Sequence, residues 1–137
     1  MKPSRKIRGL IILLVTSLLC ISAAPQATLY RLTIVNRSGY RIAVQLTYTN
    51  DDGTTTQRYY LTVPRGDKER PIKKTFSIIP EEYTAKVYYL ETYDPVYGYH
   101  CSKNPSTKFE ADRNMMMKVN SCDARIRPSK ELTIIKL

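Results

Sequence analysis

The sequence predicts an all-β protein, an antiparallel β-sandwich of about seven strands. Three observations support this fold class. Short segments alternate apolar and polar residues, turn-forming residues separate these segments at regular intervals, and no segment shows a sustained helical period. The predicted strands are also rich in β-branched residues and tyrosine, which suit a pleated surface that is buried on one side.

The segment 41–49 alternates most clearly, with Ile42, Val44 and Leu46 on one face and polar residues on the other. The residues Asn50–Gly53 after it predict a hairpin turn, because Asp-Gly supplies the positive φ that a tight loop needs. The same criteria predict strands over 29–36, 41–49, 56–63, 72–79, 83–93, 115–119 and 132–137, with a polar, irregular segment over 102–114.

The N-terminus has the three parts of a secretory signal peptide. Residues 1–9 contain four cations and no acid, residues 10–21 are apolar except for two hydroxyl side chains, and small residues follow. The apolar run is shorter than the about 20 residues that a membrane span needs. We therefore expect residues 1–27 to be a signal peptide, with cleavage after Ala23 or Ala27.

Two alternatives would keep the chain at a membrane. One is an uncleaved signal anchor, and the other is a bacterial lipoprotein with a lipidated Cys20. The bulky Leu19 stands before Cys20, where a lipoprotein signal needs a small residue. The leading prediction is a secreted or extracytoplasmic protein, located in the periplasm or at the cell surface if the source is bacterial.

Residues 28–137 are long enough for a single β-sandwich domain with its own core. Four of the 22 lysines and arginines lie in the predicted signal, so 18 remain against 12 acids and the net charge falls from +10 to about +6. These cations are scattered rather than clustered, and no nucleic-acid motif is present. We expect no nucleic-acid partner.

One stretch resembles a known family. Phe76, Ile78, Pro80, Tyr83 and Val87 match the strand–turn–strand signature of prealbumin-like modules, which include transthyretin-like, carboxypeptidase regulatory-type and Cna-B-type domains. The match covers residues 75–87, and glutamates stand where the family has a turn glycine. The resemblance implies an Ig-like or prealbumin-like sandwich of seven strands with a structural, adhesive or accessory role.

Two cysteines, Cys101 and Cys122, follow the predicted signal. An even pair in an oxidising compartment indicates one disulfide. A metal-binding pair of thiols is the alternative, but the spacing is not C-x-x-C and the chain has one histidine.

The candidate binding loop is rich in tyrosine and lies next to Cys101. Its residues are Tyr93, Asp94, Tyr97 and Tyr99. Tyrosine gives a large contact area at a low entropy cost, so a rigid loop of this kind can bind a sugar ring or a protein. We expect the basic segment 65–74 to extend this surface, and the partner to be an unknown protein or glycan.

The sequence favours a non-enzymatic protein without a cofactor or metal. His100 has no evident catalytic partner, and the carboxylate pairs Asp51–Asp52 and Glu81–Glu82 lie in predicted turns. The run Met115–Met117 could supply soft copper ligands, although alternate strand residues face opposite sides. The leading function is therefore binding or structural, and the alternatives are an accessory or inhibitor-like domain, a small enzyme and a copper-binding protein.

Asn36-Arg37-Ser38 forms an N-glycosylation sequon. This sequon would matter in a eukaryotic secretory pathway.

Overall fold

The computed structural model describes residues 25–94, 98–99, 104–122 and 132–137. These residues form strands and connections without a helix, and so the described part contains no helix able to span a membrane. The strands are β1 (Tyr30–Asn36), β2 (Arg41–Thr49), β3 (Thr55–Val63), β4 (Ile72–Ile78), β5 (Glu82–Leu90), β6 (Tyr93–Asp94), β7 (Gly98–Tyr99), β8 (Ser106–Glu110), β9 (Met115–Val119) and β10 (Leu132–Lys136).

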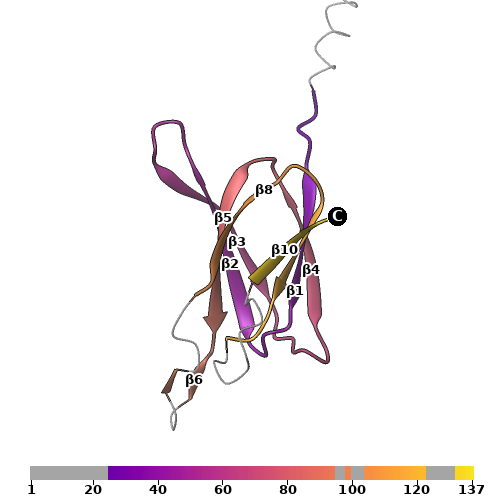
Figure 1. Ribbon diagram of the computed structural model, residues 1–137, viewed down its shortest axis with the longest axis vertical. Coiled ribbons are helices and arrows are strands. Elements are labelled where there is room, and N and C mark those ends of the chain that lie inside the picture. Colours follow the sequence, from indigo (N-terminus) through magenta and orange to yellow (C-terminus); the bar gives the residue numbers. More distant parts are fainter. Residues whose placement is uncertain (1–24, 95–97, 100–103, 123–131) are drawn as a thin grey trace, which may run out of the picture.

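Eight of these strands form two four-stranded sheets, and β6 and β7 form a small hairpin of their own (Figure 1). The first sheet has the order β10-β9-β1-β4 and the second has the order β3-β2-β5-β8. The prediction of an all-β sandwich is confirmed at this level. One pair departs from the predicted antiparallel arrangement, since β1 and β9 are parallel. Two parallel neighbouring strands need a crossover connection. Between β1 and β9 the chain forms the strands of the second sheet, and these strands provide the crossover.

The core lies between the two sheets and follows the predicted alternation. On β2 the side chains of Ile42, Val44 and Leu46 are fully buried, and Leu32 and Ile34 of β1 are buried opposite them. Alternate side chains of β1 and β2 therefore point into the core, and the others lie on the outer faces, where Val35 and Ala43 are also buried.

Among the residues that the structure describes, Tyr83 has the largest fully buried side chain. Its ring packs edge-on against Tyr59, at 6.1 Å between centroids, and lies 5.8 Å from the ring of Phe109. Its hydroxyl donates a hydrogen bond of 2.8 Å to the carbonyl of Ile79. Burial, followed by the nearby Tyr59, raises the pKa of Tyr83 to about 12.

One predicted strand end was wrong, and one strand was missed. The strand predicted over 83–93 ends at Leu90, because Glu91 adopts a left-handed φ of 58° that breaks the extended chain. The segment 102–114, predicted to be irregular, contains β8. This strand pairs with β5 and places Phe109 opposite Tyr83.

The predicted turn over Asn50–Gly53 is confirmed. Gly53 has a φ of 83°, and its amide donates to the carbonyl of Asn50. The Asp52 carboxylate accepts hydrogen bonds from the hydroxyl and the amide of Thr54, which lower the pKa of Asp52. The β2–β3 hairpin extends past the end of the sheets (Figure 1).

Asn36 has a structural role in the folded domain. Its side chain is fully buried, and its amide nitrogen donates to the carbonyls of Tyr40, at 2.7 Å, and Pro64, at 2.8 Å. Its amide oxygen accepts from the backbone and the hydroxyl of Ser38. Both hydrogens on the nitrogen are in use, so a glycan at Asn36 is incompatible with this fold.

Candidate functional site

The predicted tyrosine loop forms a hairpin where the structure describes it. Tyr93 is the backbone partner of Tyr99, and Asp94 is the partner of Gly98. The β6–β7 hairpin projects from the end of the sandwich opposite the β2–β3 hairpin (Figure 1). Tyr97 lies outside the described residues.

The proposed disulfide stays a prediction. Cys122 lies half-buried against the core, whereas Cys101 and His100 lie outside the described residues.

The predicted basic segment 65–74 divides into two parts. Its first part is a loop of mixed charge, in which the Asp67 carboxylate accepts hydrogen bonds from the backbone amides of Arg70 and Glu69, which lower the pKa of Asp67. Its second part belongs to β4, where the Lys74 ammonium lies 5.5 Å from the centre of the Phe76 ring. The segment therefore does not form one continuous basic patch.

The methionine run divides between two faces, as predicted. Met115 and Met117 are fully buried in the core, and Met116 lies on the outer face of the first sheet. The two buried thioethers pack with the other core residues.

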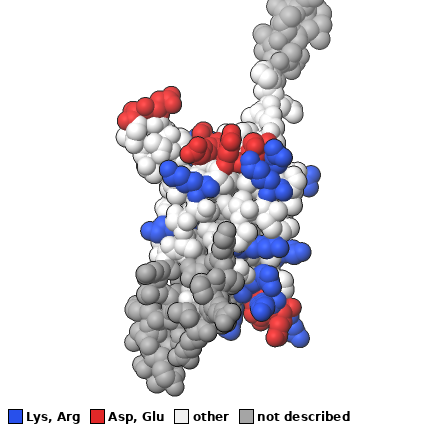
Figure 2. Space-filling model, viewed as in Figure 1, with Lys and Arg blue, Asp and Glu red and all other residues white. Residues whose placement is uncertain are grey.

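Both predicted carboxylate pairs lie at one end of the sandwich, which carries the β2–β3, β4–β5 and β8–β9 connections and which we call the acidic end. Figure 2 shows acidic side chains gathered at this end. Six of the 12 acids of the chain lie in or beside these connections, namely Asp51, Asp52, Glu81, Glu82, Glu110 and Asp112.

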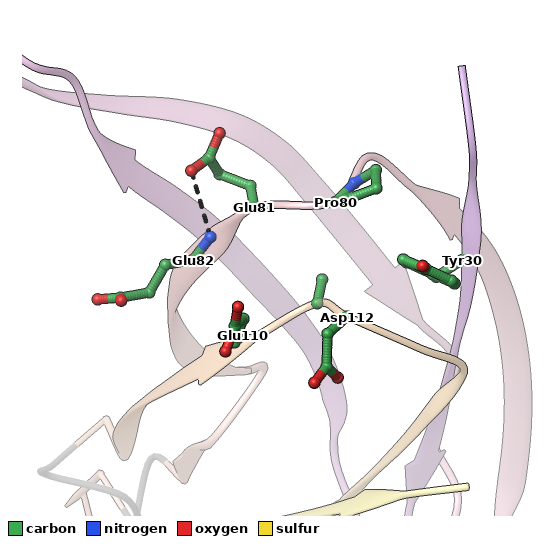
Figure 3. A pocket seen from close by; sticks show the side chains of 7 residues that line it. Tyr30, Pro80, Glu81, Glu82, Glu110 and Asp112 are labelled. Carbon is green, nitrogen blue, oxygen red and sulfur yellow. Dashed lines mark hydrogen bonds between the residues drawn. The ribbon is translucent and has the colours of Figure 1, made fainter. Parts of the chain in front are cut away.

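A pocket of about 470 Å³ opens at the acidic end, and β1, the β4–β5 turn and the β8–β9 turn surround it. Its lining comprises Tyr30, Pro80, Glu81, Glu82, Glu110, Ala111 and Asp112. Figure 3 shows the carboxylates pointing in different directions, with Tyr30 at the wall that β1 forms. The pocket is open and polar.

The carboxylates of this pocket do not form a metal centre. In the part of the chain that the structure describes, no three His, Cys, Asp or Glu side chains are grouped closely enough to hold a metal ion. Asp112 is already paired with Lys136, at 2.8 Å, and with Arg113, at 3.3 Å, and these cations lower its pKa. The Glu81 carboxylate accepts a hydrogen bond from the backbone amide of Glu82.

A second candidate surface is the outer face of the second sheet. The strand registers align its side chains in rows across β3, β2, β5 and β8. The central row contains Tyr60, Gln45, Lys86 and Ser106. The row on one side of it contains Thr62, Ala43 and Tyr88. The row on the other side contains Gln57, Thr47, Thr84 and Lys108. We call Gln45, Gln57, Tyr60, Lys86 and Tyr88 the polar face.

Side-chain hydrogen bonds hold the polar face in order. The Tyr88 hydroxyl donates to Gln45 Oε1 at 3.1 Å, and Gln45 Nε2 donates to Gln57 Oε1 at 2.6 Å. The Lys86 ammonium lies 5.2 Å from the centre of the Tyr88 ring. Tyr60, directly opposite Gln45, is 52% exposed.

The sequence indicated part of this surface. Alternation placed the polar residues of 41–49, such as Gln45 and Thr47, away from the core, which the structure confirms. Because neighbouring residues of a strand face opposite sides, Tyr88 lies on the outer face while Tyr89 is buried. Alternation did not indicate that Tyr60 lies opposite Gln45, because register depends on a β-bulge. The bulge between Leu46 and Thr47 shifts the pairing of β3 by one residue.

No known family model matches the chain, and no curated protein or solved structure matches it. The functional proposal therefore depends on the geometry of the sites described above.

Proposed function

We propose that this chain is an exported, non-enzymatic β-sandwich that acts by binding, and that the polar face is its main contact surface. One observation carries the proposal. The chain of hydrogen bonds from Tyr88 through Gln45 to Gln57 holds a flat surface in place beside the exposed ring of Tyr60.

This surface has the composition of a contact site. Tyrosine contributes a rigid apolar ring and a polar hydroxyl, and glutamine contributes both donors and acceptors. Because the side chains are already ordered by one another, a partner would bind with a smaller loss of side-chain entropy. The polar face lies on strands, which hold binding groups more rigidly than loops do.

Export is the second part of the proposal. It depends on the basic, apolar and small-residue segments of residues 1–27, and on the pairing of Cys101 with Cys122 in an oxidising compartment. A prealbumin-like sandwich with an adhesive or accessory role is consistent with the order of the two sheets and belongs to the same proposal.

The test is retention of extracytoplasmic material from the native source on the immobilised exported domain. A triple variant, Gln45→Ala, Tyr60→Ala and Lys86→Ala, removes the central row of the polar face. We expect it to lose most of the retained material, while Lys118→Gln with Thr133→Ala, on the outer face of the first sheet, retains it. Equal retention by the wild type, the triple variant and the control variant would contradict the polar face as the contact surface.

An accessory or inhibitor-like domain is the second candidate function. The observation that favours it is the β6–β7 hairpin, which projects from the end of the sandwich (Figure 1). A projecting segment can enter the cleft of an enzyme, and the proposed disulfide would anchor it near Cys101. In this case Tyr93→Ala with Tyr99→Ala, rather than the triple variant, would abolish the interaction.

A further inference from the structure

We infer that the polar face binds an acidic polysaccharide whose charge comes from uronate carboxylates. The inference rests on the proposed function and gives that surface a class of ligand. Its basis is the juxtaposition of an exposed tyrosine ring, two linked amides and a lysine on one flat sheet surface.

The ring of Tyr60 fits the apolar face of a sugar. Its side chain is 52% exposed and stands on β3, the edge strand of the second sheet. Sugar rings carry their C–H groups on a flat face, and that face can stack on an aromatic ring while the hydroxyls stay in water. An exposed edge position leaves room for a long chain to pass over it.

The amides of Gln45 and Gln57 fit the hydroxyl groups of the same sugar. Their mutual hydrogen bond of 2.6 Å uses one hydrogen of Gln45 and one oxygen of Gln57. Among the residues that the structure describes, the second hydrogen of Gln45 Nε2 and both hydrogens of Gln57 Nε2 have no hydrogen-bond partner. Donors of this kind are available to sugar oxygens.

Lys86 supplies the charge that selects an acidic sugar. It is the backbone partner of Gln45, so it lies on the opposite side of Gln45 from Tyr60. It is exposed and makes no ion pair with another described residue. Lys108 is its diagonal neighbour on β8, at about 7 Å between Cα atoms. The net charge of about +6 in the predicted mature chain favours approach of a polyanion.

Two carboxylates mark the end of the proposed binding site on the outer face of the second sheet. Glu82 and Glu110 are paired in the next row beyond Lys108, on the same outer face. Their charges repel a polyanion, so the ligand is confined to the rows that contain Tyr60, Gln57 and Lys86. The site holds two lysines, Lys86 and Lys108, and so few cations favour a chain with one charge per sugar over a densely sulfated one.

The experiment titrates the exported domain with hexagalacturonate and with its methyl ester, which has the same rings without the charges. We expect hexagalacturonate to bind, to bind several-fold more weakly in high salt, and to bind more tightly than the ester. Tyr60→Ala should weaken binding of both ligands about tenfold, as truncation of an aromatic anchor does, whereas Tyr60→Phe should bind like the wild type.

The charge variants complete the test. Lys86→Gln should reduce the affinity for the acid form to that for the ester, and Glu82→Gln with Glu110→Gln should raise it. Lys118→Gln, on the other sheet, is the matched control and should bind like the wild type.

Absence of binding, equal affinity for acid and ester, or binding that Tyr60→Ala leaves unchanged would each overturn the inference. If the triple variant loses native material while hexagalacturonate does not bind, the ligand class is wrong and the proposed function stands. If the triple variant retains native material as the wild type does, the polar face is not the contact surface, and the proposed function is wrong.

Discussion

At the scale of single residues, Asn36 shows how one side chain can fix a turn. Its four hydrogen bonds join the end of β1 to Ser38, Tyr40 and Pro64, and all its polar atoms are buried. Buried polar groups lose more free energy when a partner is removed than the bond itself contributes. Asn36 is therefore a structural residue, although it is also the first residue of an N-glycosylation sequon.

Asn36→Asp should destabilise the domain by about 3 kcal/mol or more, because a carboxylate cannot donate to the two carbonyls and is itself buried. Chemical denaturation of the exported domain measures the change. Asn50→Asp is the matched control: Asn50 donates to Thr54 and Thr56 on an exposed hairpin, so its loss should cost less than about 1 kcal/mol. Equal losses for the two variants would contradict the role of Asn36.

Gly66 occupies a place where the backbone leaves no space. A Cβ on this residue would lie 2.5 Å from the amide nitrogen of Ile72 and 2.6 Å from the carbonyl oxygen of Asn36. Gly66→Ala should therefore cost about 3 kcal/mol in the free energy of unfolding, since backbone atoms must move. Gly53→Ala, where the added carbon meets nothing but φ is 83°, should cost about 1 kcal/mol. A smaller loss for Gly66→Ala than for Gly53→Ala would be inconsistent with this packing.

Tyr83 makes the free energy of unfolding depend on pH in the alkaline range. Its folded-state pKa, about 12, exceeds the ordinary value of 10.0, so folding favours the neutral phenol. The resulting stability is complete below pH 10 and falls as the pH rises from 10 to 12.

Tyr83→Phe should cost about 1 kcal/mol at neutral pH, because it removes the hydrogen bond to Ile79. It should also reduce the loss of stability between pH 10 and 12. Denaturant titrations across this range measure both effects. Tyr60→Phe leaves Tyr83 intact and should keep the full alkaline loss; an identical pH profile for Tyr83→Phe and the wild type would contradict the assignment.

At the scale of elements, most strands could be predicted from the sequence. The strand over 41–49 alternates clearly because one of its faces is buried in the core and the other is partly exposed. β4 is mostly exposed, and its prediction depended on Phe76, which is half-buried, and Ile78, which is buried. β8 was missed because one of its five side chains, Phe109, is buried, and this leaves too little pattern to detect. The end of β5 was missed because Glu91 is not a residue that usually signals a left-handed backbone.

Glu91 gives a test at the end of β5. Its φ of 58° strains a residue with a Cβ, and its ion pair with Arg41 is exposed and contributes little. Glu91→Gly should raise the free energy of unfolding by about 0.5–1 kcal/mol. Glu91→Gln separates the loss of charge from the change in backbone and should alter stability by less than about 0.5 kcal/mol. Destabilisation by the glycine variant would show that the ion pair, rather than the strain, dominates.

At the scale of the whole molecule, the sandwich separates three regions. The acidic end is formed by three strand connections, the β6–β7 hairpin projects from the other end, and the polar face lies on one side of the second sheet (Figures 1 and 2). The alternation of apolar and polar residues predicted the fold class and composition predicted the net charge, but neither could predict this arrangement. The polar face depends on strand pairs far apart in the sequence, such as Gln45 with Lys86.

The choice between the polar face and the β6–β7 hairpin can be decided by one measurement. Hydroxyl-radical footprinting of the exported domain, with and without its bound native material, reports which tyrosines become protected. We predict protection at Tyr60 and Tyr88, with Tyr48 on the β2–β3 hairpin unchanged. Protection confined to Tyr93 and Tyr99 would contradict the polar face as the contact surface and would favour the inhibitor-like alternative.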